Sequence, residues 1–464
     1  MSDRVLVLGG GLAGVACARE LADEGVEVTL VDRNDYHQFQ PLLYQVASSQ
    51  LPAEDIARPH RTIFKEHPSV EVVTAQVTAA DLSDRSLTLT DGRTLQGSHL
   101  VMAAGARPNF FGVPGAAEYA FPLYSVVDAE RLRLHLQGLL EAAIDDAASR
   151  EPGLIDVVVV GGGPTGVETT GALAELMLAL HKSGRLAVPG QITVVDRGNA
   201  LLGQFSDKAH GYALEKLTEA GAQVRLGVGV TAVHPDRVQF DDGSTLPART
   251  VVWGGGESGS AVAQTAGPSP GRGGRLDVRP DLTVPGYPGT YAVGDVANIP
   301  SGDDAVALPQ LGSVAQQSGK WAGQNIVREL HGKPIEPFVY KDKGIMAMIG
   351  RNAAVAEVGK RHHQVEGPIA FAAWLGVHAM LLSGVHSKTD AFLSWAWDYF
   401  DRDHAATIEA TSATPERLAW ADHGEDMPHI FLDRPDEAAV HQNSHHDVEN
   451  REPGGQSRRS DQEE

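Results

Sequence analysis

Two glycine-rich segments of nearly the same sequence constrain the fold of this chain more than any other feature. The first is VLVLGGGLAGVACAREL, beginning at Val5, and the second is VVVVGGGPTGVETTGAL, beginning at Val157. Each predicts a strand, a tight turn and a helix, and each leads to another apolar strand that ends in Asp32 or Asp196. Such a unit is typical of a dinucleotide-binding site, in which a pyrophosphate sits at the helix N-terminus. Two copies therefore predict two dinucleotides.

Each copy supplies the parts that such a site needs, and we call each set a cradle. The first glycine permits the tight turn, the second lets the pyrophosphate approach the backbone, and the third lets helix and strand pack closely. The acid accepts hydrogen bonds from ribose hydroxyls. The predicted sets are Gly9, Gly11, Gly14 and Asp32 in the first cradle, and Gly161, Gly163, Gly166 and Asp196 in the second.

The second acid also bears on the choice of nucleotide. Asp196 would repel a 2′-phosphate and so favours NADH over NADPH, whereas Arg197 beside it would favour the phosphate. Glycine-rich turns are common, so ordinary tight turns are the alternative for either segment alone. The strand, helix and acid around each copy argue against that alternative.

The two halves of the chain resemble each other beyond the glycines. The segment VQFDDGSTLPARTVVWGGG, beginning at Val238, repeats the layout of residues 86–105. We predict an α/β fold with two Rossmann-like dinucleotide-binding domains, a smaller C-terminal α+β region and a disordered tail. The expected boundaries are 1–112 with 285–330 for the first domain, 113–284 for the second, 331–410 for the C-terminal region, and 411–464 for the acidic tail.

Composition excludes several classes of partner and mechanism. A formal net charge of -22 argues against nucleic acid and against electrostatic attraction to anionic lipid. Cys17 is the single cysteine, so a redox-active cysteine pair is absent. No secretory signal and no apolar run long enough for a membrane span are evident, which predicts a cytoplasmic or peripheral membrane protein. Residues 440–446, VHQNSHH, read as solvated polar residues, and no metal site is predicted.

Two further motifs indicate which cradle holds which nucleotide. TYAVGDVA, at Thr290, resembles the second FAD fingerprint of the two-dinucleotide-domain flavoproteins, and VMAAGARP, at Val101, resembles their crossover segment. The resemblance implies that the first cradle binds FAD and the second binds NADH, and that Asp295 contacts the ribityl chain. The further FAD contacts that it implies are Arg33, Pro41, Leu42, Tyr44, Val77, Ala104, Gly105 and Gly294.

Three longer segments narrow the resemblance to one family. FQPLLYQVASSQLPAEDIARPHR at Phe39, YKDKGIMAMIGRNAAVAE at Tyr340 and WLGVHAMLLSG at Trp374 resemble segments of type II NADH dehydrogenases, over about residues 4–402. The resemblance implies that the chain passes a hydride from NADH to FAD and then two electrons to menaquinone or ubiquinone, without proton pumping. It also implies a homodimer attached peripherally to the cytoplasmic face of the membrane.

The same resemblance implies a set of catalytic residues. Glu168 would lie near the nicotinamide and the flavin, Lys343 would lie near the flavin, and two glutamines would lie on the quinone side. The alternatives without a catalytic role are a solvated acid in the first turns of a helix for Glu168, a surface group for Lys343, and core packing for the segment from Pro41 to Tyr44. The implied catalytic set is Glu168, Gln316, Gln317 and Lys343.

Departures from the family pattern leave the electron acceptor open. Gly312 stands where the family has a glutamine associated with quinone access, and Gln310 is a candidate substitute. The segment WGGGESGS at Trp253 also differs from the family's Thr-Ala-Gly. A soluble electron acceptor is therefore the alternative to quinone, and a redox sensor with a structural flavin is a third hypothesis.

Trp374, Trp395 and Trp397 suggest an interfacial helix pair, with a dimer interface or core packing as the alternative.

Overall fold

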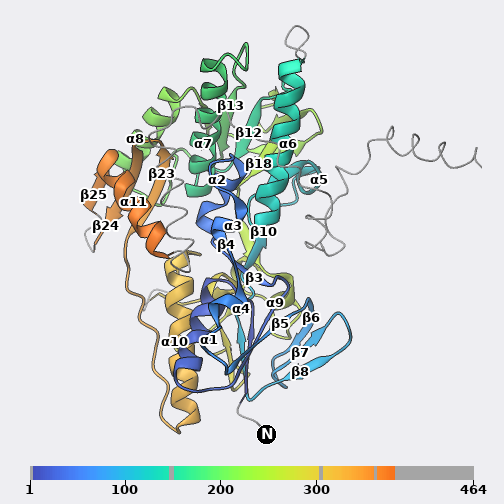
Figure 1. Cartoon of the computed structure of the whole chain (residues 1–464), viewed down its shortest axis with the longest axis vertical. Coiled ribbons are helices and arrows are strands. Elements are labelled where there is room, and N and C mark those ends of the chain that lie inside the picture. Colours follow the sequence, from blue (N-terminus) through green and yellow to red (C-terminus); the bar gives the residue numbers. More distant parts are fainter. Residues whose placement is uncertain (1–3, 146–150, 302–306, 360–362, 382–464) are drawn as a thin grey trace, which may run out of the picture. The chain divides into compact units, whose positions relative to one another are not determined.

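The computed structural model describes residues 4–145, 151–301, 307–359 and 363–381 (Figure 1). The predicted tail, the histidines of 440–446, and Trp395 and Trp397 lie outside the described residues.

The first dinucleotide-binding unit is a five-stranded parallel sheet. Its strand order is β21-β9-β1-β2-β5. The three central strands are buried, as expected for apolar runs covered on both faces. The strands are β1 (Val5–Leu8), β2 (Val28–Asp32), β5 (Val70–Thr74), β9 (His99–Met102) and β21 (Thr290–Ala292), and the helices are α1 (Leu12–Asp23) and α10 (Gly312–Leu330).

The second unit repeats this arrangement strand for strand, in the order β11-β18-β12-β13-β14. Each sheet is accompanied by a three-stranded antiparallel sheet at the equivalent place in the chain. The strands of the second parallel sheet are β11 (Ala120–Pro122), β12 (Val157–Val160), β13 (Ile192–Asp196), β14 (Gln223–Leu226) and β18 (Thr250–Trp253). Its helices are α6 (Val126–Asp145), α7 (Pro164–Lys182) and α8 (Asp207–Glu219). The antiparallel strands are β6 (Val77–Asp81), β7 (Ser86–Leu89) and β8 (Thr94–Gln96), and β15 (Val230–Val233), β16 (Arg237–Phe240) and β17 (Thr245–Pro247).

This correspondence confirms the predicted α/β class with two Rossmann-like units. The domain boundaries stay a prediction, although the pairing of β21 with β9 agrees with a discontinuous first domain. Two short strands, β10 (Ala106–Pro108) and β19 (Glu257–Gly259), pair antiparallel where the chain passes between the units.

Small residues bring α10 directly against α1 (Figure 1). A Cβ atom at Gly319 would lie 2.0 Å from the carbonyl oxygen of Ala13, so only glycine permits this approach. Cys17 is buried on α1, as expected for a small core residue. The crossing places the start of α10 beside η3 (Gly294–Val296), which carries Asp295.

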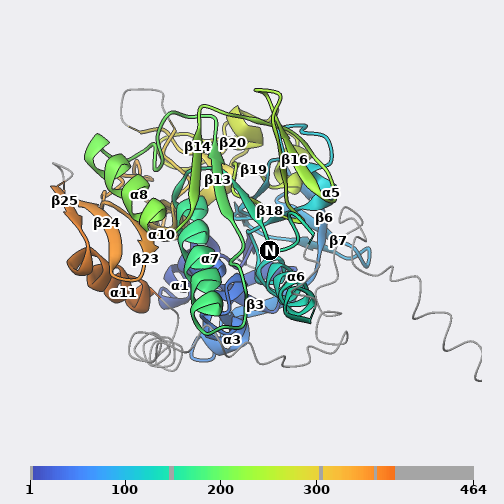
Figure 2. The ribbon, with the colours of Figure 1, turned by 90° about the horizontal axis from the view of Figure 1, so that it is seen from above.

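The C-terminal region is a three-stranded sheet and a helix. It comprises β23 (Ile345–Gly350), β24 (Ala353–Val358), β25 (His363–Glu366) and α11 (Pro368–Leu381), which lie beside α7 and α8 (Figure 2). A Cβ atom at Gly171 of α7 would lie 1.7 Å from the carbonyl oxygen of Ile349, so helix and strand are in backbone contact.

One of the three tryptophans expected at an interface lies in the core. Trp374 of α11 is 0% exposed, stacks on His378 with ring centroids 3.9 Å apart, and meets the Tyr44 ring edge-on at 6.4 Å. The interfacial prediction for Trp374 is wrong and the core-packing alternative is right, because its helix packs against the segment from Phe39 to Ala47, which hides the indole ring from solvent.

Short elements complete the described part of the chain. Those of the first half are β3 (Tyr36–Gln38), η1 (Gln40–Leu42), α2 (Leu43–Ala47), α3 (Ala53–Ile56), β4 (Ala57–Pro59), α4 (His60–Ile63) and α5 (Ala116–Tyr119). Those of the second half are α9 (Ala261–Gln264), η2 (Arg272–Gly274), β20 (Leu276–Asp277) and β22 (Ala297–Asn298).

Candidate functional site

The first and third glycines of both cradles have matching geometry. Gly9 has φ +106° and Gly161 has φ +108°, a left-handed backbone that favours glycine. A Cβ atom at Gly14 would lie 1.8 Å from the Gly9 carbonyl oxygen, and one at Gly166 would lie 1.8 Å from that of Gly161. These positions therefore require glycine for the turn and for the packing of helix on strand.

The middle glycines of both cradles leave the backbone open to approach. No atom lies within 4 Å of a Cβ atom built at Gly11 or at Gly163. Both residues directly precede a helix, α1 and α7, so the open backbone positions lie at the helix N-termini. A phosphate can approach the backbone there, where amide groups and the helix dipole favour negative charge.

The acid of each cradle is anchored by the turn. Asp32 Oδ2 accepts a hydrogen bond from the Gly10 amide, and Asp196 Oδ2 accepts one from the Gly162 amide at 2.6 Å. Their Oδ1 atoms accept backbone amides two residues farther along the chain, at 2.7 Å and 2.6 Å. Both carboxylates are thus fixed beside the open glycines, where the ribose of a dinucleotide belongs. Arg197 is exposed and lies against Gly229.

The Gly-Asp corner after β21 provides a polar atom without a partner. Among the described residues, Asp295 Oδ1 is buried and has no hydrogen-bond partner. Burial raises the pKa of the Asp295 carboxyl to about 6, and the nearby Arg275 guanidinium opposes that rise. A buried acceptor without a donor suits the hydroxyl groups of a ribityl chain. Gly294 beside it has φ +67°, and its amide donates to Ser318 Oγ at 3.1 Å.

Glu168 lies in the second turn of α7, two residues after Gly166. Its Oε1 accepts the Met348 amide at 3.1 Å, so the carboxyl joins α7 to β23. Burial raises its pKa to about 8, and hydrogen bonds from Met348 and Trp374 oppose that rise. It borders a pocket of about 10 Å³, room for one water molecule. The lining residues are Tyr44, Gln50, Glu168, Ala172, Glu175, Met348 and Gly350.

The expected flavin-side segment packs largely in the core. Leu42 is 0% and Tyr44 is 3% exposed, and the Tyr44 hydroxyl donates to Met348 Sδ at 3.2 Å. Pro41 is partly exposed. The core-packing alternative thus describes Leu42 and Tyr44, and their contact with FAD stays a prediction.

The expected quinone-side glutamines, Gln316 and Gln317, lie in α10, and Lys343, expected near the flavin, precedes β23. Gln317 donates to the Lys341 carbonyl and accepts the Lys341 amide, each at 3.0 Å, so its amide is occupied by backbone. Gln310 donates to the Asp295 carbonyl at 3.1 Å rather than taking the place of a residue at position 312. Gly312 is exposed, Gln316 is partly exposed and Lys343 is exposed. The remaining predicted FAD residues, Arg33, Val77, Ala104 and Gly105, are all partly or fully exposed.

Two buried histidines near the first cradle were not predicted. His37 Nδ1 and His60 Nε2 lie 2.9 Å and 3.0 Å from the Gly10 carbonyl oxygen. Both rings thus contact the backbone of the glycine-rich turn in the first cradle. Burial lowers the pKa of His37 to about 4, so its ring is neutral at pH 7. These residues stand 27 and 50 positions from Gly10, and no sequence spacing relates them to it.

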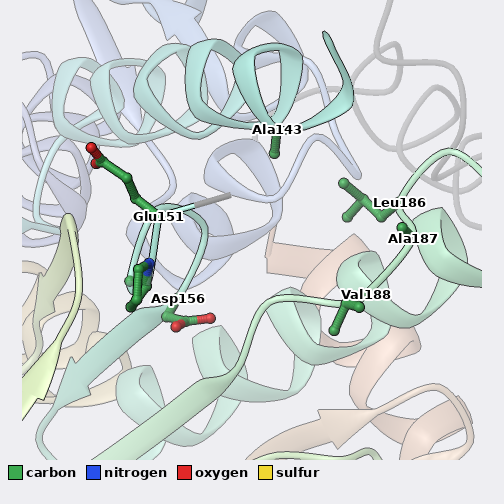
Figure 3. Close-up of a pocket in the computed structure, with 8 residues that line it drawn as sticks. Ala143, Glu151, Asp156, Leu186, Ala187 and Val188 are labelled. Atoms are coloured by element: carbon green, nitrogen blue, oxygen red, sulfur yellow. The ribbon is translucent and has the colours of Figure 1, made fainter. Parts of the chain in front are cut away.

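A larger pocket lies away from these residues. Its volume is about 330 Å³, and it is next to the start of β12, opposite the cradle end of the strand (Figure 3). Leu186, Ala187 and Val188 face Asp156 across it. It contains none of the predicted site residues, so we do not assign the reaction to it.

Comparisons with known proteins show the family of this chain. The model of the pyridine nucleotide-disulphide oxidoreductase family matches residues 3–319. The type II NADH:quinone oxidoreductase Ndh of Mycobacterium tuberculosis is 33% identical over 410 residues, which are 84% of this chain and 87% of that protein. The type II NADH:quinone oxidoreductase of Staphylococcus aureus is 30% identical over 370 residues, 76% of this chain and 89% of that protein.

A solved structure is also similar in fold. NDH2 from Plasmodium falciparum in complex with NADH superposes with a TM-score of 0.77, at 20% identity, over 87% of this chain and 100% of that chain.

Proposed function

Because this chain belongs to the pyridine nucleotide-disulphide oxidoreductase family and, within it, to the type II NADH:quinone oxidoreductases, we propose that it transfers electrons from NADH through FAD to a membrane quinone. FAD is its cofactor and NADH its reductant. The observation that carries the proposal is the pair of matched cradles, each with an open middle glycine and an anchored acid. Hydride and electron transfer between adjacent rings moves no ion across a membrane, so the proposal includes no proton pumping.

The chain's own residues would hold and align the two nucleotides. Bound FAD supplies the hydride acceptor and the two-electron store. The first cradle and Asp295 would hold its pyrophosphate and ribityl chain, and the second cradle with Asp196 would hold NADH. The protein's contribution to hydride transfer is then alignment of two rings rather than acid–base chemistry.

Reduction of a quinone also requires protons, and Glu168 is the group that we assign to supply one. Its pKa of about 8 keeps the carboxyl protonated at pH 7, in contrast to an exposed glutamate. The Met348 amide fixes one carboxyl oxygen. The neighbouring pocket has room for one water molecule that could carry the replacement proton.

We place the membrane contact on α11. Among the described residues, no helix is long and apolar enough to cross a membrane. The solvent-facing side of α11 is apolar: Ile369 is 74% and Val377 is 39% exposed, and the neighbouring exposed positions are Ala372, Ala373 and Gly376. Such a face suits shallow insertion at a lipid surface. Attachment at the cytoplasmic face and a homodimer stay predictions from the family resemblance.

A soluble acceptor is the second candidate function. It is favoured by Gly312 at the position of the family glutamine and by the occupied side-chain amide of Gln317. Both features leave fewer free hydrogen-bond donors for a quinone carbonyl.

Stopped-flow absorbance separates the two candidates. The purified yellow holoprotein is first reduced with NADH and then mixed with a short-chain menaquinone or ubiquinone analogue. Rapid bleaching by NADH followed by recovery much faster than in air-saturated buffer would support quinone as acceptor. Recovery no faster than in air would contradict it, and absence of bleaching would contradict both candidate functions.

A further inference from the structure

Tyr124 lies where the chain enters the second sheet, between β11 and α6, but its ring reaches back to the first unit. The phenol oxygen accepts a hydrogen bond from the Ala106 amide at 2.7 Å. A Cβ atom built at Gly105 would lie 2.9 Å from the same oxygen. The hydroxyl is therefore in contact with the crossover segment, beside the glycine expected to face FAD.

Several hydrogen bonds hold Tyr124 in this position. Its carbonyl oxygen accepts the side-chain amides of Gln38 at 3.2 Å and Gln40 at 3.3 Å. Gln38 Oε1 also accepts the Val126 amide at 3.1 Å. Both glutamines belong to the segment of the first unit that leads to Pro41. The tyrosine is thus anchored on the flavin side of the first unit, although it belongs to the chain of the second.

The hydroxyl keeps a proton that it can donate. Its oxygen accepts hydrogen bonds from the Ala106 amide and from the Gln40 side chain, and accepting them leaves the O–H available. Burial raises the pKa of the phenol well above its ordinary range, and the nearby charges of Asp295 and Glu257 raise it further. The group therefore remains a donor throughout the physiological pH range.

The neighbourhood of this donor is also where a ligand oxygen is needed. Strand β10, which begins at Ala106, pairs with β19, and β19 also contacts η3, which carries Asp295. The buried Asp295 Oδ1, which has no hydrogen-bond partner, therefore lies in the same part of the first unit. A polyhydroxylated chain carries both donors and acceptors, so it can satisfy an acidic acceptor and a phenolic donor together.

We propose that the Tyr124 hydroxyl donates a hydrogen bond to the ribityl chain of bound FAD, the same chain that Asp295 is expected to contact. Through this contact, a residue of the second unit becomes part of the FAD site of the first unit. It rests on the assignment of the first cradle to FAD and is independent of the electron acceptor.

The test compares FAD affinity in Tyr124→Phe and Tyr119→Phe. Tyr119 is a matched control, since its hydroxyl interacts with Glu118 at the surface, away from the cradles. Apoprotein of each variant and of the unsubstituted chain is titrated with FAD, following the quenching of flavin fluorescence. We expect Tyr124→Phe to raise the Kd for FAD about 5- to 10-fold, as for loss of one hydrogen bond, and Tyr119→Phe to leave it unchanged.

A purely structural role would give a different result. It would lower the unfolding midpoint of the Tyr124→Phe apoprotein while leaving the Kd for FAD unchanged, and that outcome would overturn the proposal. If the apoprotein does not stay folded, the temperature of flavin release from the holoprotein is measured instead. Release of flavin at the same temperature as from the unsubstituted holoprotein would overturn the proposal equally.

Discussion

Glu168 illustrates how much of a residue's chemistry is set by distant parts of the chain. The sequence predicts its place near the second cradle, because it follows Gly166 on the cradle helix. Its raised pKa depends on burial by β23 and α11, and the Met348 amide that binds it is 180 positions away. No local pattern in the sequence predicts that β23 and α11 bury this carboxyl.

The protonation of Glu168 predicts a pH dependence for reoxidation of the flavin by quinone. The proton-donating form predominates below about pH 8 and is lost as pH rises through that value. We expect the reoxidation rate of the unsubstituted protein to fall above about pH 8. Glu168→Gln should lower the rate about 100-fold or more at pH 7 and abolish this dependence. Stopped-flow measurement between about pH 6 and pH 9.5 checks both.

The exposed acid Glu215 on α8 provides the control. Glu215→Gln should keep the rate and the pH dependence of the unsubstituted protein, because its carboxylate is 62% exposed. An unchanged fall above pH 8 in Glu168→Gln would show that another group supplies the proton.

The contact between α7 and β23 could not be predicted from the sequence either. The sequence predicts α7 as the helix of the second cradle and β23 only as part of an α+β region. Their approach depends on Gly171, which has no special role in any local motif. This contact holds β23 close to Glu168 and so determines the environment of that carboxyl. A glycine inside a helix is otherwise unfavourable, which indicates that the packing requires it.

Alanine substitution tests this contact. Gly171→Ala should lower the free energy of unfolding by about 1–3 kcal/mol, because its Cβ atom would meet the Ile349 carbonyl. Gly211→Ala on α8, where a Cβ atom meets nothing within 4 Å, should be neutral or stabilising by up to about 1 kcal/mol. Urea unfolding measures both, and equal effects would contradict the packing argument.

The apolar face of α11 makes its own prediction. Ile369→Asp should reduce binding to lipid vesicles about 10-fold or more, because an exposed isoleucine would no longer enter the apolar layer. Val188→Asp, at a residue 61% exposed outside this helix, should leave vesicle binding unchanged. Co-sedimentation with neutral phospholipid vesicles measures the bound fraction, and equal binding by all three proteins would rule out this face as the contact.

At the scale of the whole molecule, the duplication could be predicted because the segments that form both cradles and both antiparallel sheets repeat in the same order along the sequence. The packing of the C-terminal region on α7 could not be predicted, because no pattern in that region repeats an earlier one. The burial of Trp374 follows from this packing, and an apolar helix gives no sequence sign of which face it hides.

Two substitutions test whether the repeated units bind different nucleotides. Asp196→Ala should weaken NADH binding about 10-fold while the protein retains FAD, whereas Asp295→Ala should lose FAD. The measurements are flavin content after gel filtration and NADH titration of the holoprotein. Loss of FAD from Asp196→Ala with retention in Asp295→Ala would reverse the assignment of the cradles.

The strand orders of the two sheets have a consequence for the order of events during synthesis. The edge strand β21 of the first sheet is made after every strand of the second, since Thr290–Ala292 follows Thr250–Trp253 in the chain. A ribosome therefore releases a complete second sheet while the first still lacks its last strand. Until then the edge of β9 that later pairs with β21 has no partner in the first sheet, and an unpaired strand edge is open to mispairing.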